Sequence, residues 1–381
     1  MKKNFLLKQY LSDKKMKIRH NYLSEQFKDR KKIFKLINKT INFNDFTLGR
    51  HVENFEKSFC KYQKSKYSIG VGSGTDAIFL SLKALGIKEG DEVLTPVYSF
   101  YATAGAIATT GAKPVFVDIN EDLNIDVKKI EKKINKKTKA IVPVHWSGRI
   151  CDMDQILKIS KKYNLFIVED ACHAIIAQDK RKRFAGNYGI TGCFSMHPLK
   201  NLNVWGDGGI ITTNSKKIYE RLKLLRNHGL IDRNNCKIYG YNSRLDTIQA
   251  AVGLEMIKKI NYITKRRIEN AKYLNKNLSK INQIKIIKEN TNAKSVFHLY
   301  QFYCKKRDEL NNYLRKNKID SKIHYPIPLH LHDAAKKLNH KRGDYPNAER
   351  FSKNIISLPV HEFVTKKDLD LMIGKIRNFY N

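Results

Sequence analysis

From about residue 67 the chain alternates between short apolar runs and stretches with helical spacing, and this alternation restricts the fold more than any other feature. Runs that are apolar on both faces are typical of a sheet buried between two helix layers. They are YSIGVGSG, DEVLTP, KPVFVDI, KAIVPVHW, LFIVEDA, GCFSM and GGIITTN, separated by helical stretches such as TDAIFLSLKALGI and DMDQILKISKKYN. Strands that alternate with helices predict an α/β fold with a mainly parallel sheet.

After about residue 246 the pattern changes to long amphipathic helices and then to a shorter mixed region. KSVFHLYQFYC at 294–304 is expected to form a strand, and KKDLDLMIGKIRNFY the last helix. At 381 residues the chain is long enough for more than one domain. We expect an N-terminal helical segment at 1–45 that packs on the domains, a large α/β domain at 46–265 and a small C-terminal α/β domain at 266–381.

The composition bounds the partners of the protein. Lys and Arg number 73 against 36 Asp and Glu, a formal net charge of +37, which permits contact with polyanions. The excess is spread over the whole length and no nucleic-acid module is present, so a generally lysine-rich surface is the competing interpretation. Six cysteines lie far apart without a CxxC pair, which predicts free thiols, no metal site and a cytoplasmic location. No segment has the ~20 apolar residues of a membrane helix.

A glycine-rich stretch, GSGTDA at 72–77, ends one expected strand and opens the next helix. Backbone N–H groups at a helix N-terminus, reached past small residues, form an anion site that suits phosphate. A tight turn that needs glycine explains the stretch equally, because it is neither a Walker loop nor a GxGxxG motif. By itself it leaves both interpretations open.

The stretch FIVEDACHA places two acids at the end of an apolar strand. Glu169 and Asp170 would lie at the carboxyl edge of a parallel sheet, where α/β proteins bind ligands. An acid there can pair with a cationic ring nitrogen, and His173 can reach the same ligand. A structural or metal-binding carboxylate is the alternative.

A third stretch, CFSMHPLKNLNVWGDGG at 193–209, carries Ser195 and Lys200 after another strand end. Burial near a carboxylate lowers the pKa of a lysine, and such an amine can form a covalent bond to an aldehyde. In a chain with so many lysines a solvated or structural Lys200 is the competing interpretation, which spacing alone does not exclude.

Taken in order, these motifs resemble the DegT/DnrJ/EryC1/StrS sugar aminotransferases. The resemblance rests on GSGTDA, PVYSFYATAGAIATTGAKPVFVDI, EDACHA, FSMHPLKNLNVWGDGG, RNHGL, GYNSRLDTIQAAVG and HYPIPLHL, and runs from about residue 20 to the end. It implies a fold-type-I enzyme dependent on pyridoxal 5′-phosphate. Such an enzyme would transfer an amino group, with glutamate the expected donor, to a nucleotide-linked keto-sugar for surface polysaccharide or glycan biosynthesis.

The resemblance also implies roles around the cofactor ring. Lys200 would hold the cofactor covalently, and Asp170 would pair with the pyridinium nitrogen. His173, where the family often has Gln, would contact the phenolic oxygen, and Phe100 would stack on the ring. Lys200, Asp170 and His173 are thus the expected catalytic residues.

By the same resemblance, the phosphate would be held from two chains. Its expected partners are Gly74, Thr75 and Ser195, together with Asn242 of the neighbouring subunit. A site completed by a second chain makes a homodimer the expected working unit.

Two positions depart from the family pattern, and alternative functions follow from the same fold. Where the family usually has HLYGQPADMD, this chain has HWSGRICDMD, with Ser147 for an aromatic residue and Arg149 for Gln. Arg149 could face an acidic substrate group or form a surface salt bridge. The resemblance leaves amination at C3 or at C4 of the sugar open and slightly favours C3. A related sugar dehydratase, in which histidine replaces the lysine, and a non-catalytic regulatory or binding protein are the alternatives, and Lys200 and Asp170 favour the aminotransferase.

Overall fold

The larger part of the computed structural model, which describes residues 15–289 and 293–381, is built on a seven-stranded sheet with the order β1-β7-β6-β5-β4-β2-β3. The strands are β1 (Tyr67–Val71), β2 (Glu92–Pro96), β3 (Lys113–Val117), β4 (Thr138–Ile141), β5 (Phe166–Asp170), β6 (Thr191–Ser195) and β7 (Gly209–Thr213). All neighbours pair in parallel except β7, which is antiparallel to β1 and β6. The expected mainly parallel α/β sheet is confirmed.

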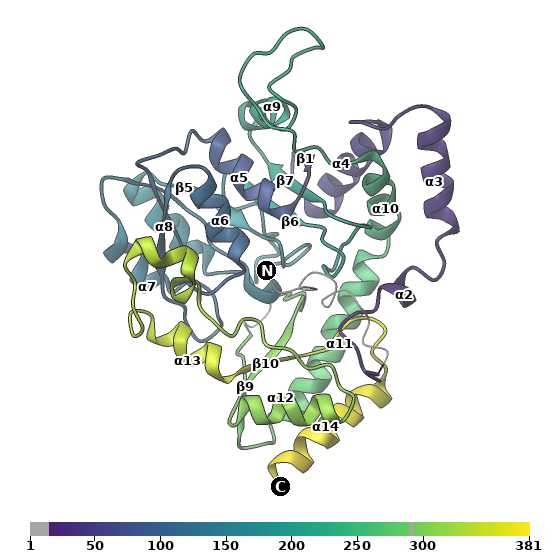
Figure 1. Cartoon of the computed structure of the whole chain (residues 1–381), viewed down its shortest axis with the longest axis vertical. Helices are drawn as coiled ribbons and strands as arrows, with labels where there is room; N and C mark the ends of the chain where they lie inside the picture. The colour runs from purple at the N-terminus through teal and green to yellow at the C-terminus, as the bar shows by residue number, and fades with distance from the viewer. Residues whose placement is uncertain (1–14, 290–292) are drawn as a thin grey trace.

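Helices cover both faces of this sheet (Figure 1). Side chains alternate along each strand, so Ile167 and Phe194 enter one core while Val168 and Cys193 enter the other. The first core is shared with α4 (Arg50–Gln63), α8 (Met153–Tyr163) and α10 (Thr247–Ile257), and the second with α5 (Gly74–Ala84), α6 (Tyr101–Thr109) and α9 (Lys216–Leu225). Burial on both faces explains why these strands are apolar throughout.

A smaller α/β unit follows α11 (Ile260–Leu278). It has an antiparallel sheet with the order β10-β9-β8, and its core contains residues of α11 and of two more helices. Its elements are β8 (Ile284–Ile286), β9 (Tyr300–Cys304), α12 (Arg307–Lys316), α13 (Pro346–Asn354), β10 (Ile355–Leu358) and α14 (Lys366–Tyr380). It forms the lower part of Figure 1.

The strand expected at 294–304 is only partly correct. Tyr300–Cys304 forms β9, but residues before it bond to the larger part of the chain instead. The backbone N–H of Val296 donates to Gly148 at 3.2 Å, and that of His298 donates to Ser147 at 3.0 Å. A backbone N–H that already donates to the turn at residues 146–148 of the larger part cannot also pair with a strand of the smaller sheet.

The N-terminal segment contacts both cores. Ile18 is buried in the core of the smaller unit, and Ile33 of α3 (Lys31–Asn42) is buried in the larger one. A short helix, α2 (Leu23–Gln26), lies between them. The first 14 residues of the expected segment at 1–45 lie outside the described residues.

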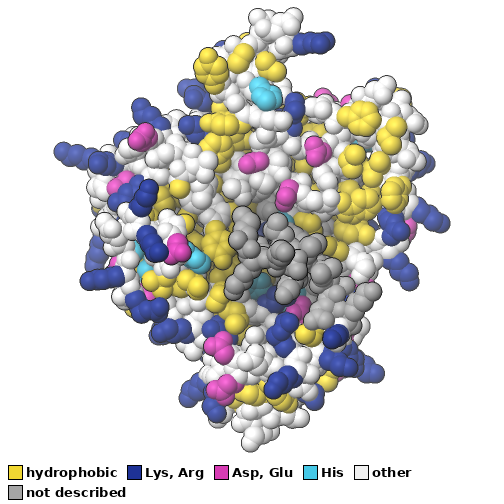
Figure 2. All heavy atoms as spheres, viewed as in Figure 1, with side chains coloured by type: hydrophobic (Ala, Val, Ile, Leu, Met, Phe, Trp, Pro, Cys, Tyr) yellow, Lys and Arg dark blue, Asp and Glu magenta, His cyan; other side chains and the backbone are white. Residues whose placement is uncertain are grey.

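The charge excess is dispersed over the surface. Figure 2 shows Lys and Arg side chains spread around the outline of this face and not gathered in one patch. In the described ranges, no helix is long and apolar enough to cross a membrane, and no group of three or more acidic, His or Cys side chains could hold a metal ion.

Glu169 in β5 points away from Asp170 and serves the fold. Its carboxylate, fully buried, accepts backbone N–H bonds from Gly186 at 2.7 Å and Gly189 at 2.6 Å, and Nε2 of His145 lies 2.8 Å away. A buried carboxylate with this many donors fixes the loop between β5 and β6. Of the two acids in the motif, this one is the structural carboxylate.

We predict that Glu169→Ala lowers the free energy of unfolding of the cofactor-free protein by about 3 kcal/mol or more, because it leaves several buried donors without a partner. Denaturant unfolding followed by circular dichroism measures the change. Glu131→Ala, at an exposed carboxylate, is the control and should leave the unfolding midpoint in place. Equal stability of the two variants would contradict this account of Glu169.

Candidate active site

A cavity of about 450 Å³ lies where strand ends of the large sheet face the smaller unit. One wall comes from the start of α5 and the ends of β5 and β6, and the other from the N-terminal segment and residues 298–361. Seven of the predicted site residues line it: Gly74, Thr75, Phe100, Asp170, His173, Ser195 and Lys200.

The N-terminus of α5 forms one end of this cavity. Ser73 caps the helix, its Oγ accepting the Asp76 N–H at 3.1 Å. Gly74 follows at the closest approach to β6, where an added Cβ would lie 2.6 Å from Cβ of Ser195. Close packing therefore requires glycine here, and the helix N-terminus at Gly74 and Thr75, which line the cavity, is placed to act as an anion site.

Asp170 is held with its carboxylate toward the cavity. Its Oδ2 accepts from Oγ1 of Thr103 at 2.8 Å, and its Oδ1 accepts from the Cys172 N–H at 3.2 Å. Thr103 is itself linked to Ser99 at 2.8 Å. This orientation leaves Asp170 suited to a cationic ring nitrogen. Sequence reasoning gave Thr103 no role, although its position one turn after Phe100 is compatible with one.

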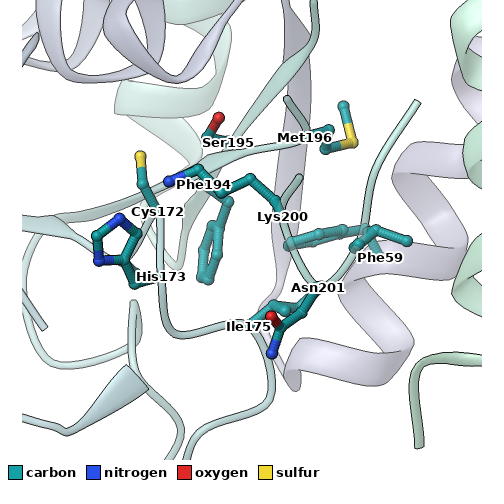
Figure 3. A pocket seen from close by; sticks show the side chains of 11 residues that line it. Phe59, Cys172, His173, Ile175, Phe194, Ser195, Met196, Lys200 and Asn201 are labelled. Atoms are coloured by element: carbon teal, nitrogen blue, oxygen red, sulfur yellow. The ribbon is translucent and has the colours of Figure 1, made fainter. Parts of the chain in front are cut away.

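Lys200 enters the cavity from the turn that follows β6. Its side chain extends toward Cys172 and Ser195, with His173 on the same side (Figure 3). Burial lowers the pKa of its amine below the ordinary value, opposed by nearby Cys172 and Asp170. No hydrogen bond to Nζ is found in the described part of the chain, which leaves the amine free to react.

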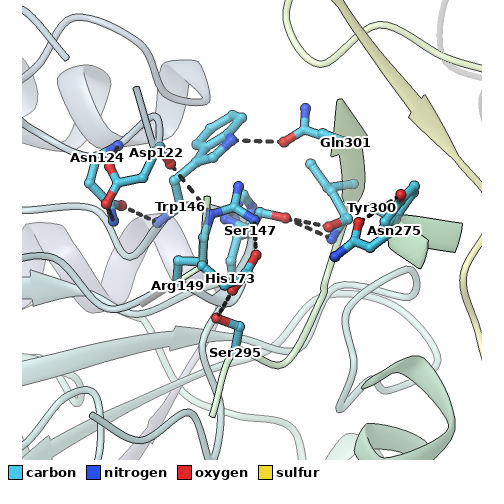
Figure 4. Close-up of polar contacts among 12 residues, drawn as sticks. Asp122, Asn124, Trp146, Ser147, Arg149, His173, Asn275, Ser295, Tyr300 and Gln301 are labelled. Atoms are coloured by element: carbon cyan, nitrogen blue, oxygen red, sulfur yellow. Dashed lines mark hydrogen bonds and ion pairs between the residues drawn. The ribbon is translucent and has the colours of Figure 1, made fainter. Parts of the chain in front are cut away.

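His173 is held as a neutral imidazole with a defined tautomer. Burial lowers its pKa well below the ordinary value, and nearby Lys200 acts in the same direction. The Ser147 N–H points at its Nδ1 from 3.3 Å, so Nδ1 accepts and Nε2 carries the proton. Oγ of Ser147 bonds the Leu299 carbonyl, which joins this support to the smaller unit (Figure 4). The backbone N–H at position 147 thus orients the histidine, and the side chain of the serine that replaces the expected aromatic residue adds the bond to Leu299.

Phe100 stands at the cap of α6 on the open side of the cavity. It is 47% exposed, and its ring centroid lies 5.7 Å from that of Tyr325. These two rings give the cavity a flat apolar wall that a planar ligand can contact.

Arg149 does not lie where either sequence interpretation put it. It is 4% exposed, and its NH1 pairs with Glu289 at 3.1 Å while Nε donates to the Asp122 carbonyl at 3.4 Å (Figure 4). It is absent from the cavity wall. Arg149 therefore does not reach the cavity, and it is not a surface residue either. It is a buried cation whose partner, the partly exposed Glu289, lies in the segment after β8.

Asn242 lies apart from the cavity of its own chain. It is exposed at the base of the loop that follows α9, which projects at the top of Figure 1. This position is compatible with the expected role toward a neighbouring subunit.

Comparison with known proteins places the chain. Residues 28–377 match the DegT/DnrJ/EryC1/StrS aminotransferase family. The pleiotropic regulatory protein of Geobacillus stearothermophilus is 37% identical over 94% of this chain and 97% of its own. The dTDP-3-amino-3,6-dideoxy-alpha-D-galactopyranose transaminase of Aneurinibacillus thermoaerophilus is 36% identical over 92% and 95%. The crystal structure of S. venezuelae DesV with a ketimine intermediate has a TM-score of 0.91 and 33% identity, over 94% and 97%.

The chain belongs to the DegT/DnrJ/EryC1/StrS aminotransferase family. It is a sugar aminotransferase of fold type I that depends on pyridoxal phosphate, as its enzymatic relatives and solved neighbours in pyridoxal and pyridoxamine forms show. The expected family, fold type, enzyme class and cofactor are confirmed.

The side chains of the cavity fit pyridoxal phosphate. Gly74, Thr75 and Ser195 line the cavity at the start of α5, where a phosphate can meet the helix N-terminus. The oriented carboxylate of Asp170 suits the ring nitrogen, and the amine of Lys200, which has no hydrogen-bond partner among the described residues, suits the aldehyde.

We predict that covalent attachment of pyridoxal phosphate speeds up with rising pH and levels off at a lower pH than for free lysine. The neutral amine attacks and the ammonium does not, and burial lowers the pKa at which Lys200 loses its proton. Visible absorbance of the cofactor-free enzyme after cofactor addition measures the rate, and borohydride with peptide mass spectrometry locates the bond.

Lys200→Ala is the control and should bind the cofactor without covalent attachment. A pH profile equal to that of free lysine, or trapping on another lysine, would contradict the assignment.

Proposed function

We propose that this aminotransferase moves the amino group of glutamate onto C3 of a nucleotide-linked keto-sugar, for surface polysaccharide or glycan biosynthesis. The observation that carries the proposal is the amine of Lys200, which has no hydrogen-bond partner among the described residues, in one cavity with the oriented carboxylate of Asp170. The Aneurinibacillus relative is named as a transaminase of a 3-amino-sugar, which supports C3 over C4.

The residues of the cavity take separate roles in this proposal. Lys200 holds the cofactor, Asp170 pairs with its ring nitrogen and Nε2–H of His173 donates to its phenolic oxygen. Phe100 stacks on the ring. The phosphate partners are Gly74, Thr75 and Ser195, with Asn242 of the partner subunit.

In this proposal one side chain moves a proton in both halves of the reaction. Pyridoxal phosphate, when bound, supplies an electron sink for the carbon that loses its proton. Once the donor amine has taken its place on the cofactor, Nζ of Lys200 would take that proton from the α-carbon of the donor. Burial lowers the pKa of the amine, which favours the neutral form that a base needs. In the second half the same atom returns a proton to the sugar carbon. The bonds from Thr103 and Cys172 would hold the Asp170 carboxylate toward the ring nitrogen in both halves.

We predict that the loaded enzyme converts a dTDP-linked 3-keto-6-deoxyhexose with glutamate to the amino-sugar, and that Lys200→Ala lowers the rate by about 10⁴-fold or more because the base is lost. Mass spectrometry of the sugar product and a coupled assay for 2-oxoglutarate measure both halves. The 4-keto isomer of this sugar is the control substrate. A preference for the 4-keto isomer would contradict amination at C3. If neither sugar is aminated, the proposed substrate class is wrong.

A regulatory role is the second candidate, since one relative bears the name of a regulatory protein. A purely regulatory protein would keep its effect in the Lys200→Ala variant. Turnover by the wild-type enzyme decides in favour of catalysis.

The proposed working unit is a homodimer. The loop at 227–243 leaves two large apolar side chains on the surface, with Tyr239 99% exposed and Ile231 63% exposed. Exposed apolar side chains on a projecting loop favour a protein partner, and Asn242 sits at its base. We propose that the loop reaches the partner's cavity.

Mixing two defective variants tests this exchange. Lys200→Ala and Asn242→Ala place their defects in different sites of a mixed dimer, so one site has both residues intact. We predict that co-refolding or co-expression restores about a quarter of wild-type activity, because half of randomly formed dimers are mixed and each has one complete site. Activity no greater than the sum of the separate variants would contradict a shared site.

We also propose where the protein works and how its chain divides into domains. A cytoplasmic setting is supported by six free cysteines, which suit a reducing compartment. We propose the large domain at 46–265 and the small one at 266–381, with the N-terminal segment bound to both.

A further inference from the structure

The cavity wall opposite the phosphate cradle is rich in nitrogen groups that lack partners. Nε2 of His20 and Nδ1 of His298 are buried and have no hydrogen-bond partner in the part of the chain that is described. Both residues line the cavity, as do Lys322 and His324. A buried polar atom without a partner is unfavourable, so two on one wall indicate a ligand that supplies the missing bonds.

The N-terminal segment is tied down in a way that places His20 on this wall. The backbone N–H groups of Lys17 and Ile18 donate to the Lys318 carbonyl, at 2.8 and 3.1 Å. The backbone N–H of Asp320 donates to the Ile18 carbonyl at 2.9 Å. The His20 N–H then donates to Oδ2 of Asp320 at 3.1 Å. The position of His20 is therefore set by backbone bonds to the segment that also carries Lys322.

The charges at this point do not balance. Oδ1 of Asp320 pairs with both Arg315 at 2.9 Å and Lys322 at 3.1 Å. One carboxylate between two cations leaves an excess positive charge at the cavity wall. The side chain of Lys322 is 40% exposed, so it keeps room for a second anionic partner.

The imidazoles beside it add hydrogen-bonding groups without adding charge. The rings of His20 and His324 lie 6.1 Å apart, edge to face. Burial lowers the pKa of His20 to about 3 and that of His324 to about 4, so both are neutral at pH 7. Nδ1 of His324 is already bonded to Oγ of Ser357 at 2.9 Å. Neutral N–H groups around one excess cation match a singly charged anion.

We propose that His20 and Lys322 form the subsite for the side-chain carboxylate of the amino donor. The inference rests on the proposed function for the presence of a donor, and it assigns the acidic class of that donor to two residues outside the catalytic set. The subsite shares one cavity with Lys200.

The test measures binding without turnover. Glutarate, a dicarboxylate that cannot transfer an amino group, is titrated into the cofactor-loaded enzyme by calorimetry, and dTDP is titrated in parallel. We expect Lys322→Met and His20→Phe each to raise the Kd for glutarate about tenfold, because each removes one bond to the carboxylate. The Kd for dTDP should stay unchanged in both variants. Lys316→Met, an exposed lysine of α12, is the matched control and should change neither Kd.

Steady-state kinetics separate the donor from the sugar as the source of the carboxylate. The KM for glutamate should rise in Lys322→Met while the KM for the keto-sugar nucleotide stays constant. Unchanged glutarate affinity in both variants, or loss of dTDP or sugar affinity instead, would overturn the subsite. If no keto-sugar is aminated but glutarate binding still depends on Lys322, the proposed function fails and the carboxylate site stands. If His20→Phe does not fold, Lys322→Met decides.

Discussion

The parallel pairing of β5 with β6 is the constraint on which the site depends. It sets Asp170 opposite Cys193, two residues before Ser195. Because strand side chains alternate, the same register sends Asp170 to the cavity and Glu169 into the loop that follows β5. A shift by one residue would exchange the two acids, burying the one that the cofactor needs and exposing the one that holds the loop.

The smaller unit contributes to this site through backbone bonds more than through its core. Residues 296–299 bond to Ser147 and Gly148, and Ser147 in turn orients His173. The ion pair between Arg149 and Glu289 lies alongside this contact. Movement of the smaller unit would therefore change the orientation of His173, so cofactor chemistry and the position of the second wall are mechanically coupled.

Much of this architecture could be predicted from the sequence, because it depends on local patterns. Short apolar runs predicted the seven strands, and GSGTDA predicted the end of β1 and the start of α5. The packing of Gly74 against Ser195 could not be predicted from that stretch alone. The role of Arg149 could not be predicted, since its partner Glu289 is 140 residues away. The strand expected at 294–304 was too long, because the backbone N–H groups of Val296 and His298 donate to the turn at residues 146–148 and not to a strand. Contacts between residues far apart in the chain produce no periodic pattern of apolar residues, so the sequence does not reveal them.

The lysine excess shows why burial, and not abundance, selects the reactive amine. Among the described lysines, burial lowers the pKa of two, Lys200 and Lys294, and only the first lines the cavity with Asp170. The charge of an exposed ammonium is screened by solvent and salt within about 10 Å at ordinary ionic strength. The many surface lysines therefore change the environment of Lys200 little. A chain can therefore carry a large positive charge on its surface and still keep one amine in its site whose pKa burial lowers.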